Sequence, residues 1–353
     1  MIVKNEEDTL PRCLKSVLPA VDELVIVDTG STDGTKKIAE SFCAKVYDYP
    51  WQDDFAAARN FSFSKATKDF VMWLDADDVI DADNLQKLLR LKDELTENVL
   101  EVAAKYEVAF DEAGRCTLSY DRERIFLRKA NLLWSGEVHE TIPLLPDALF
   151  SDVAVRHAKI HPTEQGRNLR IYQNLLARGK SFTPRQTYYY ARELFYNGYY
   201  EEAENRFRSF LSGEGWLPDK IGASLLLSEC CVRLGKKTEA KTALFDSFLY
   251  GIPDGRVCCE IGGQFFADAD YQTAAYWYER ALDSSDSGQK GAFFYPDSTG
   301  YIPHIQLCVC YDRLGDTQKA RAHNEAAAVL KPESRAVQWN RDYFHRLDSV
   351  PTD

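Results

Sequence analysis

The sequence predicts two domains of different class, an α/β domain in the first half and an all-α domain of helical repeats in the second. Short apolar runs rich in β-branched residues, such as Glu23–Asp28 and Asp69–Leu74, alternate with helical segments in the first half. This alternation is typical of a parallel sheet covered by helices. A six-residue motif recurs through the second half. With 353 residues, the chain is long enough for each domain to bury its own core.

The expected elements of the first half follow the order βαβαβ, which predicts a doubly wound sheet. The helix after Glu23–Asp28 is expected to be capped by Ser31 or Thr32 and to end near Phe42. We divide the chain into an α/β domain at residues 1–165, a linking helix at 166–185 and repeats at 186–345. The other expected elements are helices at Asn5–Val17 and Asp53–Ala66, and strands at Met1–Val3, Lys45–Tyr49, Val99–Phe110, Arg124–Leu127 and Val153–Ile160.

The first expected strand is unusually short. Only Met1–Val3 precede the polar residue Lys4, whereas strands usually contain five or six residues. Either the strand is short in this protein, or the recorded start lies inside the natural strand.

The motif of the second half begins with a small residue and ends with alanine. It occurs at Gly198–Ala203, Gly235–Ala240, Ala269–Ala274 and Gly315–Ala320, with spacings of 37, 34 and 46 residues between first positions. A period near 34 resembles tetratricopeptide repeats, in which the small residue permits a tight turn between two helices and the alanine permits close packing. The longest spacing contains Asp283–Gly300, which is rich in Ser, Gly and Asp and is expected to be an inserted loop.

Composition excludes several classes of protein. Of the net charge of −12, most belongs to residues 1–165, which carry 20 Lys and Arg against 31 Asp and Glu. Such an acidic surface disfavours nucleic acid and anionic membranes as partners. No apolar run reaches the length of a membrane span, so a cytoplasmic location is expected. The nine cysteines form no CxxC pair, which favours buried reduced thiols over a zinc or redox site.

The strongest chemical signal is the pair Asp75 and Asp77, which directly follows the apolar run ending at Leu74. Carboxylates at the end of such a strand lie at the edge of the sheet where open α/β folds bind ligands. Two of them can hold Mg²⁺ or Mn²⁺ between the protein and a diphosphate. The alternative is an ordinary polar turn in which Asp78 caps the next helix.

Two further residues support a nucleotide site. Asp28 also ends a buried strand, where its carboxylate can accept a hydrogen bond from a nucleobase imide or a ribose hydroxyl. Arg59 is a lone cation on a helix of small residues and could reach a nucleotide or phosphate. Taken alone, Arg59 could equally be an ordinary surface arginine.

Four segments, MIVKNEE, DTGSTDGT, FAAARN and WLDADD, resemble in order and spacing the signatures of family 2 glycosyltransferases with the GT-A fold. The resemblance implies that Val3, Glu6, Asp28 and Arg59 surround the nucleotide of a donor sugar, usually a UDP-sugar. It further implies that Asp75 contacts the ribose and the metal, and that Asp77 is a metal ligand.

Two later blocks, WSGEVHET at Trp134–Thr141 and VRHAKIHPTE at Val155–Glu164, resemble a bacterial branch of this family in which tetratricopeptide repeats follow the GT-A domain. The branch includes peptide glycosyltransferases that modify glycocins such as sublancin. By this resemblance, His157 is a late metal or diphosphate contact, Glu140 is the catalytic base and His139 is the second candidate for that base. The processive Gln-x-x-Arg-Trp motif is missing, which argues against a polysaccharide synthase.

The sequence therefore predicts a metal-dependent, inverting, non-processive hexosyltransferase that moves a sugar from a UDP-sugar to an oxygen or sulfur of a peptide or protein. The repeats are expected to hold this acceptor or to pair two subunits. Tyr189, Arg192 and Tyr196, which share one helical face of the first repeat, are the expected lining residues if they are exposed. Three alternatives stay open, namely a cell-surface glycan or lipid-linked sugar as acceptor, a non-catalytic repeat scaffold, and a nucleotidyltransferase. The last would need a basic Gly-rich loop where Lys4–Glu7 stands.

Overall fold

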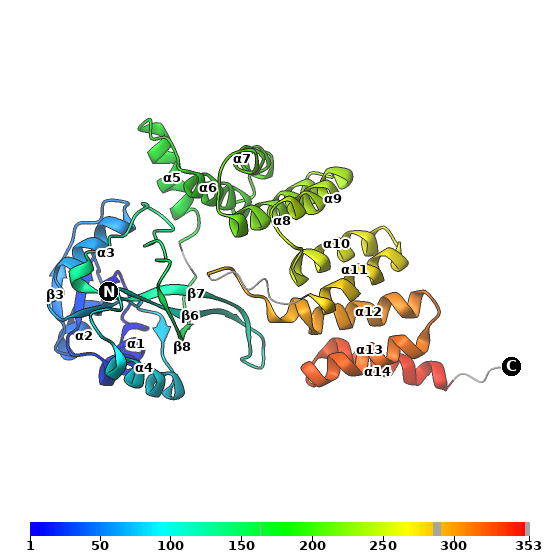
Figure 1. Cartoon of the computed structure of the whole chain (residues 1–353), viewed down its shortest axis with the longest axis horizontal. Coiled ribbons are helices and arrows are strands. Elements are labelled where there is room, and N and C mark those ends of the chain that lie inside the picture. The colour runs from blue at the N-terminus through cyan, green and yellow to red at the C-terminus, as the bar shows by residue number, and fades with distance from the viewer. Residues whose placement is uncertain (163, 285–290, 350–353) are drawn as a thin grey trace. The chain divides into compact units, whose positions relative to one another are not determined.

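The computed structural model describes residues 1–162, 164–284 and 291–349, and its contacts separate two units, Met1–Glu193 and Leu194–Asp353 (Figure 1). Each unit is described by itself. The first contains strands and helices, and the second contains helices, so the predicted α/β and all-α classes are confirmed. The domain bounds at 165 and 186 stay predictions.

The first unit begins with a small parallel sheet. Its strands β1 (Ile2–Val3), β2 (Val25–Asp28) and β3 (Lys45–Asp48) lie in the order β1-β2-β3. The register places Val3 opposite Asp28, so that β1 and β2 end side by side. The helices that follow these strands are α1 (Leu10–Val17), α2 (Thr35–Ser41) and α3 (Phe55–Ser64).

A second, mixed sheet follows. Its five strands have the order β4-β7-β6-β8-β5, with β6 and β8 parallel and the other pairs antiparallel. Helix α4 contacts β8, and Trp73 and Arg124 are among the largest side chains buried in this unit. The elements are β4 (Phe70–Met72), β5 (Asp78–Val79), α4 (Ala82–Glu94), β6 (Glu101–Phe110), β7 (Cys116–Leu127) and β8 (Leu149–His157).

The expectation of one doubly wound sheet is wrong in one respect. Strand β4 pairs with β7 and does not join the parallel sheet formed by β1, β2 and β3. With only two residues, β1 offers too little backbone to connect the two sheets.

Two helix starts also differ from the sequence-based expectation. Helix α2 begins at Thr35 with Gly34 at its N-cap, so neither Ser31 nor Thr32 caps it. The Ser31 hydroxyl instead accepts a hydrogen bond from the Asn5 amide. Helix α1 begins at Leu10 rather than at Asn5, and Pro11 lies in its first turn, where a missing N–H costs nothing.

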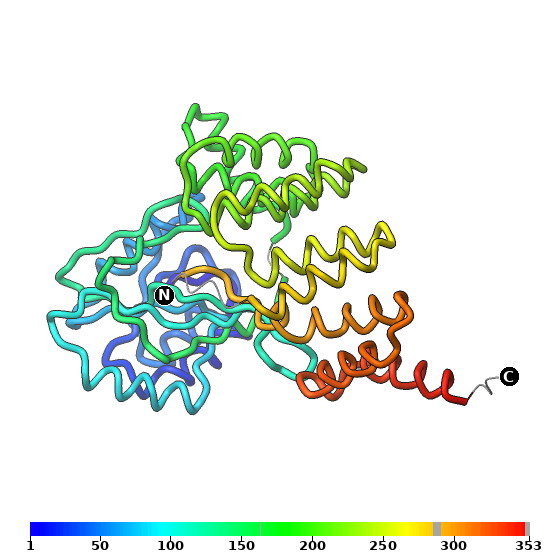
Figure 2. Tube along the Cα trace, turned by 45° about the vertical axis from the view of Figure 1, so that its right-hand side comes forward, coloured from blue at the N-terminus to red at the C-terminus, as the bar shows by residue number. Residues whose placement is uncertain are grey.

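After β8 the chain is helical. Successive helices from α7 to α14 contact one another in sequence order, as Figure 2 shows. None of the described helices is long and apolar enough to cross a membrane. The helices are α5 (Arg167–Ala177), α6 (Pro184–Tyr196), α7 (Tyr200–Ser212), α8 (Leu217–Arg233), α9 (Lys237–Asp246), α10 (Gly255–Ala267), α11 (Tyr271–Asp283), α12 (Tyr301–Arg313), α13 (Thr317–Leu330) and α14 (Arg335–Asp348).

The repeat motif has the structural role that was predicted for it. The first residue of each copy has a positive φ in the turn between two helices, and the final alanine of each copy is fully buried. The predicted loop at Asp283–Gly300 lies partly outside the described residues. The first positions are Gly198, Gly235, Ala269 and Gly315, and the alanines are Ala203, Ala240, Ala274 and Ala320.

All nine cysteines are free, as predicted. Seven of them are buried, whereas Cys43 is exposed and Cys116 is half-buried. Burial raises the pKa of Cys308 and of Cys310 to about 12, so these thiols stay protonated at neutral pH. These two cysteines therefore serve as small core side chains.

The turns permit a test of stability. Ala269 adopts a φ of 59°, which strains a residue with a Cβ, whereas Gly235 adopts 74° without strain. We expect Ala269→Gly to raise the free energy of unfolding by about 0.5–1 kcal/mol and Gly235→Ala to lower it by about 1 kcal/mol. Urea unfolding followed by circular dichroism measures both. Changes of the same sign would show that turn conformation does not control the stability of the repeats.

Candidate functional site

The carboxyl ends of β1, β2 and β4 carry the polar residues that the sequence singled out. Val3 ends β1 and lies opposite Asp28, which ends β2. The Val3 carbonyl accepts hydrogen bonds from the backbone N–H and the hydroxyl of Thr29, at 2.9 and 3.0 Å. Asp75 and Asp77 follow β4 after Trp73 and Leu74. Strand ends of this kind are where open α/β folds bind ligands.

Asp28 has one carboxylate oxygen without a partner. Its side chain is buried, with 1% of its surface exposed. Oδ1 accepts hydrogen bonds from the amides of Gly30 and Ser31, at 2.9 and 2.8 Å. Within the described part of the chain, Oδ2 has no hydrogen-bond donor. A buried acceptor without a donor costs free energy, so a hydrogen-bond donor on a bound ligand fits this position.

Glu6 lies in the loop that follows β1. Its amide donates to the Thr35 hydroxyl at 2.8 Å, and its carboxylate accepts from Thr9 at 2.5 Å. Burial raises the pKa of Glu6, and the charges of Asp77 and Asp75 add to this rise. Glu6 therefore interacts with the same group of carboxylates.

Arg59 on α3 connects two segments that are distant in sequence. Its Nη2 donates to Oδ1 of Asp75 at 2.7 Å, and its Nε donates to Oε1 of Glu140 at 2.6 Å. The guanidinium also lies over the rings of Trp73 and Trp134, 4.6 and 5.1 Å from their centroids. Arg59 thus fixes a strand-end carboxylate and the Glu140 carboxylate in one arrangement.

The charges in this arrangement stabilise one another. Burial opposes the ionised form of Asp75, but the facing Arg59 outweighs it and holds the pKa of Asp75 at about 2. Burial also disfavours the charged form of Arg59, yet Asp75 and Glu140 raise its pKa above the usual range. Arg59 and Asp75 are therefore both ionised at neutral pH.

A second cluster forms where β5 pairs with β8. The register places Asp78 opposite His157, and the Ala158 amide donates to the Asp77 carbonyl. The Nδ1 atom of His157 lies 3.5 Å from Oδ1 of Asp77 and 3.6 Å from Oδ1 of Asp78. One ligand atom from each of these three residues lies within 4.8 Å of the others. The antiparallel register thus brings the late histidine to the Asp-rich motif.

Asp78 is a structural member of this cluster. Its side chain is fully buried, and Oδ1 accepts from the Tyr106 hydroxyl at 2.8 Å. Oδ2 accepts from the Arg124 guanidinium at 3.2 Å and from the Asp75 amide at 3.0 Å. The alternative interpretation of Asp78 as a helix cap is wrong, because Asp81 caps α4.

Asp77 and His157 are the members that solvent reaches, with 19% and 26% of their side chains exposed. Burial, together with the charges of Asp75 and Asp78, raises the pKa of Asp77. A divalent cation would relieve this crowding of negative charge. A carboxylate and an imidazole are a chemically suitable donor pair for Mn²⁺, and the carboxylate also suits Mg²⁺.

Glu140 and His139 point to different partners. Glu140 is buried against Arg59, and its backbone carbonyl accepts from Arg122 at 3.2 Å. His139 has a φ of 53°, and its Nε2 lies 2.8 Å from Oε1 of Glu193. Burial lowers the pKa of His139 despite this contact. Of the two, only Glu140 contacts the Arg59 group.

Of the side chains expected to line the repeats, Tyr189 is not exposed. It is buried, and its ring stacks on His139 with centroids 4.2 Å apart. Tyr196, by contrast, has 61% of its surface exposed. Exposure, the condition for a lining role, is therefore met by Tyr196 and not by Tyr189.

Several residues of the site were missed in the sequence. Trp73 and Arg122 could have been noticed, because Trp73 lies two residues before Asp75 and Arg122 lies in a strand rich in charged residues. The guanidinium of Arg122 lies 4.7 Å from the Trp73 ring. Tyr106 and Glu193 carry no local signal, since the residues of the site that they contact, His157 and His139, lie 51 and 54 residues away along the chain.

Residues 1–144 match the family described as Glycosyl transferase family 2. The chain is 36% identical over 143 residues to a TPR repeat-containing protein of Synechococcus elongatus, covering 40% of this chain and 34% of that protein. It is 27% identical over 215 residues to the SPbeta prophage-derived glycosyltransferase SunS of Bacillus subtilis, covering 55% of this chain and 48% of SunS.

Among solved structures, MamA (41-end) from Desulfovibrio magneticus RS-1 is 17% identical with a TM-score of 0.39. That match covers 49% of this chain and 89% of MamA. The repeat fold of the second unit therefore rests on its own helices and motif. The chain spans only about a third to a half of the length of the two sequence relatives.

Proposed function

We propose, from the premise that residues 1–144 form a family 2 glycosyltransferase domain, that the protein transfers a sugar from a nucleotide sugar to a peptide or protein. The donor we propose is a UDP-sugar, and the acceptor atom is an oxygen or sulfur of a side chain. The main observation in support is that Arg59 forms ion pairs with both Asp75 and Glu140, beside the Asp77–His157 pair.

The donor would lie at the carboxyl ends of β1 and β2. The unpartnered Oδ2 of Asp28 would accept a hydrogen bond from the nucleobase or ribose. Asp75, held ionised by Arg59, would bind the ribose. Val3 and Glu6 would complete the wall around the nucleotide. Because these groups are fixed by protein hydrogen bonds, little rearrangement would be needed on binding.

Asp77 and His157 are the residues that would hold a divalent metal, Mg²⁺ or Mn²⁺. When bound, the ion would neutralise negative charge that develops on the departing nucleoside diphosphate. Asp78 would keep Asp77 and His157 in place, since it is anchored by Tyr106 and Arg124.

Glu140 would act as the general base. Arg59 binds Oε1, and we propose Oε2 as the atom that receives the acceptor's proton. As the proton leaves, the acceptor oxygen or sulfur bonds to the anomeric carbon. The bond from that carbon to the diphosphate oxygen breaks on the opposite face. The configuration inverts, and the nucleoside diphosphate departs with the electron pair.

A panel of nucleotide sugars, each incubated with the protein with and without Mn²⁺, tests this function. Slow, metal-dependent hydrolysis of one donor is the expected result. If no donor is hydrolysed or bound, the non-catalytic scaffold becomes the better explanation. A preference for glycan or lipid-linked acceptors over peptides would support the alternative acceptor class.

The repeats would select the acceptor, because tetratricopeptide arrays offer extended surfaces that suit polypeptides. We expect Tyr196→Ala, on the first helix of the array, to lower transfer to a peptide about tenfold while leaving donor hydrolysis unchanged. Tyr276→Ala is the matched control, because Tyr276 is also an exposed tyrosine, at 54%, but lies on α11, the second helix of its pair.

Both activities can be measured in one assay that separates glycosylated peptide from free sugar. If Tyr196→Ala lowers transfer and hydrolysis together, the side chain supports the fold rather than the acceptor. If neither variant changes transfer but the protein is a dimer, the repeats pair subunits instead.

A further inference from the structure

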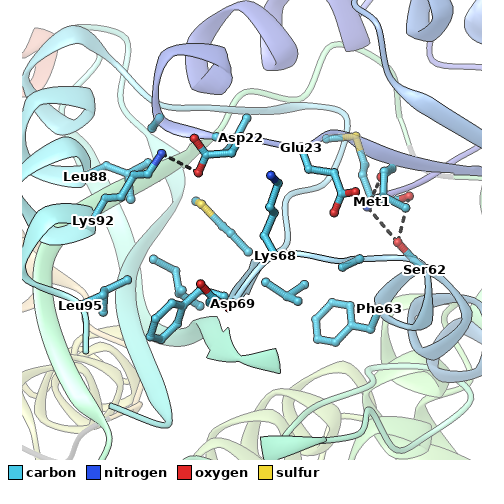
Figure 3. Close-up of a pocket in the computed structure, with 18 residues that line it drawn as sticks. Met1, Asp22, Glu23, Ser62, Phe63, Lys68, Asp69, Leu88, Lys92 and Leu95 are labelled. Carbon is cyan, nitrogen blue, oxygen red and sulfur yellow. Dashed lines mark hydrogen bonds and ion pairs between the residues drawn. The ribbon is translucent and has the colours of Figure 1, made fainter. Parts of the chain in front are cut away.

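The loop that carries Glu140 lies beside a cavity of the first unit. This cavity, of about 430 Å³, is bounded by residues 134–141 together with side chains of α3, α5 and α6. It differs from the cavity of about 370 Å³ beside the starts of β2 and β4 (Figure 3), where the charged side chains Asp22 and Glu23 are paired with lysines. A cavity beside the Glu140 loop leaves that side of the loop without packed side chains. The position of the loop therefore depends on specific polar contacts.

The backbone of this loop is constrained. Ser135 and Thr141 close it through two backbone hydrogen bonds, of 3.0 and 3.1 Å. Within it, His139 has a φ of 53°, a left-handed conformation that is unfavourable for a residue with a Cβ. His139 directly precedes Glu140. A strained residue at this point persists only where contacts with the surroundings hold it.

Glu193 on α6 supplies one such contact. Its Oε1 accepts from Nε2 of His139 at 2.8 Å and from Nδ2 of Asn168 at 3.1 Å. Burial alone would raise the pKa of Glu193, but the bonds from His139 and Asn168 outweigh it and lower this pKa. Because the ionised carboxylate only accepts hydrogen bonds, Nε2 of His139 carries a proton. The Tyr189 ring, stacked at 4.2 Å, holds the same imidazole.

Glu137 is a second anchor of the loop. Its backbone carbonyl accepts from the Phe55 amide at the start of α3, at 2.9 Å. Its carboxylate accepts from Nε2 of Gln186 at 2.9 Å and forms an ion pair with Lys180. Glu137 therefore connects the loop to α3, to the α5–α6 connection and to the first turn of α6.

Both anchors lie close to Glu140 along the chain, and Glu140 itself faces a different partner. Its Oε1 accepts from Nε of Arg59 at 2.6 Å, and Arg59 also binds Asp75. A shift of the loop would therefore move Glu140 relative to Asp75, the residue proposed to bind the donor. Misplacement of a reacting group by about 1 Å can lower a rate roughly a hundredfold.

We propose that Glu137 and Glu193 are positioning residues, which hold the loop 135–141 in the conformation that places Glu140 at the proton of the acceptor. Neither carboxylate takes part in the proton transfer. Glu193 acts through His139, and Glu137 acts through the backbone of the loop. This inference rests on the proposed function, in which Glu140 is the general base.

Alanine variants of the two anchors test this proposal. We expect Glu137→Ala and Glu193→Ala each to lower kcat with an alcohol acceptor about fivefold. The donor KM should change by less than about twofold, because the residues proposed to bind the donor are retained. Glu193→Gln should restore most of the turnover, since its amide oxygen can still accept from Nε2 of His139.

A double-mutant cycle separates positioning from general destabilisation. Adding Glu193→Ala to Glu140→Gln should change turnover by less than about twofold, because the base whose position matters is already absent. Glu204→Ala is the matched control, since Glu204 is also a buried carboxylate with two donors, Arg208 at 2.9 Å and Lys236 at 2.6 Å. It should lower the melting temperature about as much as Glu193→Ala does, without lowering kcat.

Equal losses from Glu193→Ala in the parent protein and in Glu140→Gln would overturn the proposal, as would an unchanged kcat in both alanine variants. If Glu193→Ala does not fold, the same cycle with Glu137→Ala decides, because the Glu137 side chain lies in a loop and is 16% exposed. Near-normal turnover in Glu140→Gln would instead reject Glu140 as the base, and this inference would fall with the proposed function.

Discussion

Asp77→Ala is expected to lower glycosyl transfer by at least about a hundredfold while leaving the melting temperature within about 2 °C of the parent protein. The side chain is partly exposed, and its carboxylate faces His157 at 3.5 Å. It has no buried ion pair in the described structure whose loss would destabilise the fold. The variant should also bind Mn²⁺ more weakly, which titration calorimetry measures without reference to activity.

The neighbouring Asp78 provides a contrasting control. Asp78 pairs with Arg124 in a fully buried contact, and loss of such a partner costs about 3–5 kcal/mol. Asp78→Ala should therefore lower the melting temperature on the order of 10 °C. Asp83→Ala, at an exposed carboxylate on α4, should change neither glycosyl transfer nor the melting temperature. Undiminished transfer by the parent protein in excess chelator would contradict the metal assignment.

The repeats were predicted well because their signal is local. A glycine at a turn and an alanine five residues later lie within one helical hairpin, and each acts through its own backbone conformation or size. Gly198 with its positive φ and Ala203 with its complete burial show both effects. No long-range pairing had to be known for this prediction.

The strand-end residues could also be predicted from the sequence, because an apolar run that stops at a carboxylate indicates a sheet edge. The pairing of the strands could not be predicted from the sequence. The contact of His157 with Asp77 depends on the register of β5 and β8, which lie some seventy residues apart along the chain. Only the family resemblance indicated it.

The partners of Arg59 were even harder to predict from the sequence. The sequence suggested a cation for the nucleotide, whereas the structure pairs it with Asp75 and Glu140, the latter 81 residues away. Local composition carries no information about which carboxylate an arginine will meet. The failed expectation for the α2 cap has a similar cause, since the Ser31 hydroxyl bonds to Asn5 in a different loop.

The choice between Glu140 and His139 as general base follows from their contacts. A base must reach the acceptor's proton beside the donor. Glu140 shares Arg59 with Asp75, the residue proposed to bind the donor. His139 is stacked on Tyr189 and bonded to Glu193, so it orients its own loop and anchors that loop to α6.

Glu140→Gln is therefore expected to lower the turnover number at least a hundredfold with an alcohol acceptor, and to change the donor KM by less than about twofold. The amide keeps the size of the side chain but cannot take up the proton, and Arg59 retains Asp75 as a partner. With a thiol acceptor the loss should be smaller, because a free thiol has a pKa of about 8.5 and ionises more readily.

His139→Ala should instead lower the melting temperature by a few degrees and turnover by less than about tenfold. Steady-state kinetics at several pH values compares the two variants. Near-normal turnover in Glu140→Gln together with loss in His139→Ala would exchange the two roles.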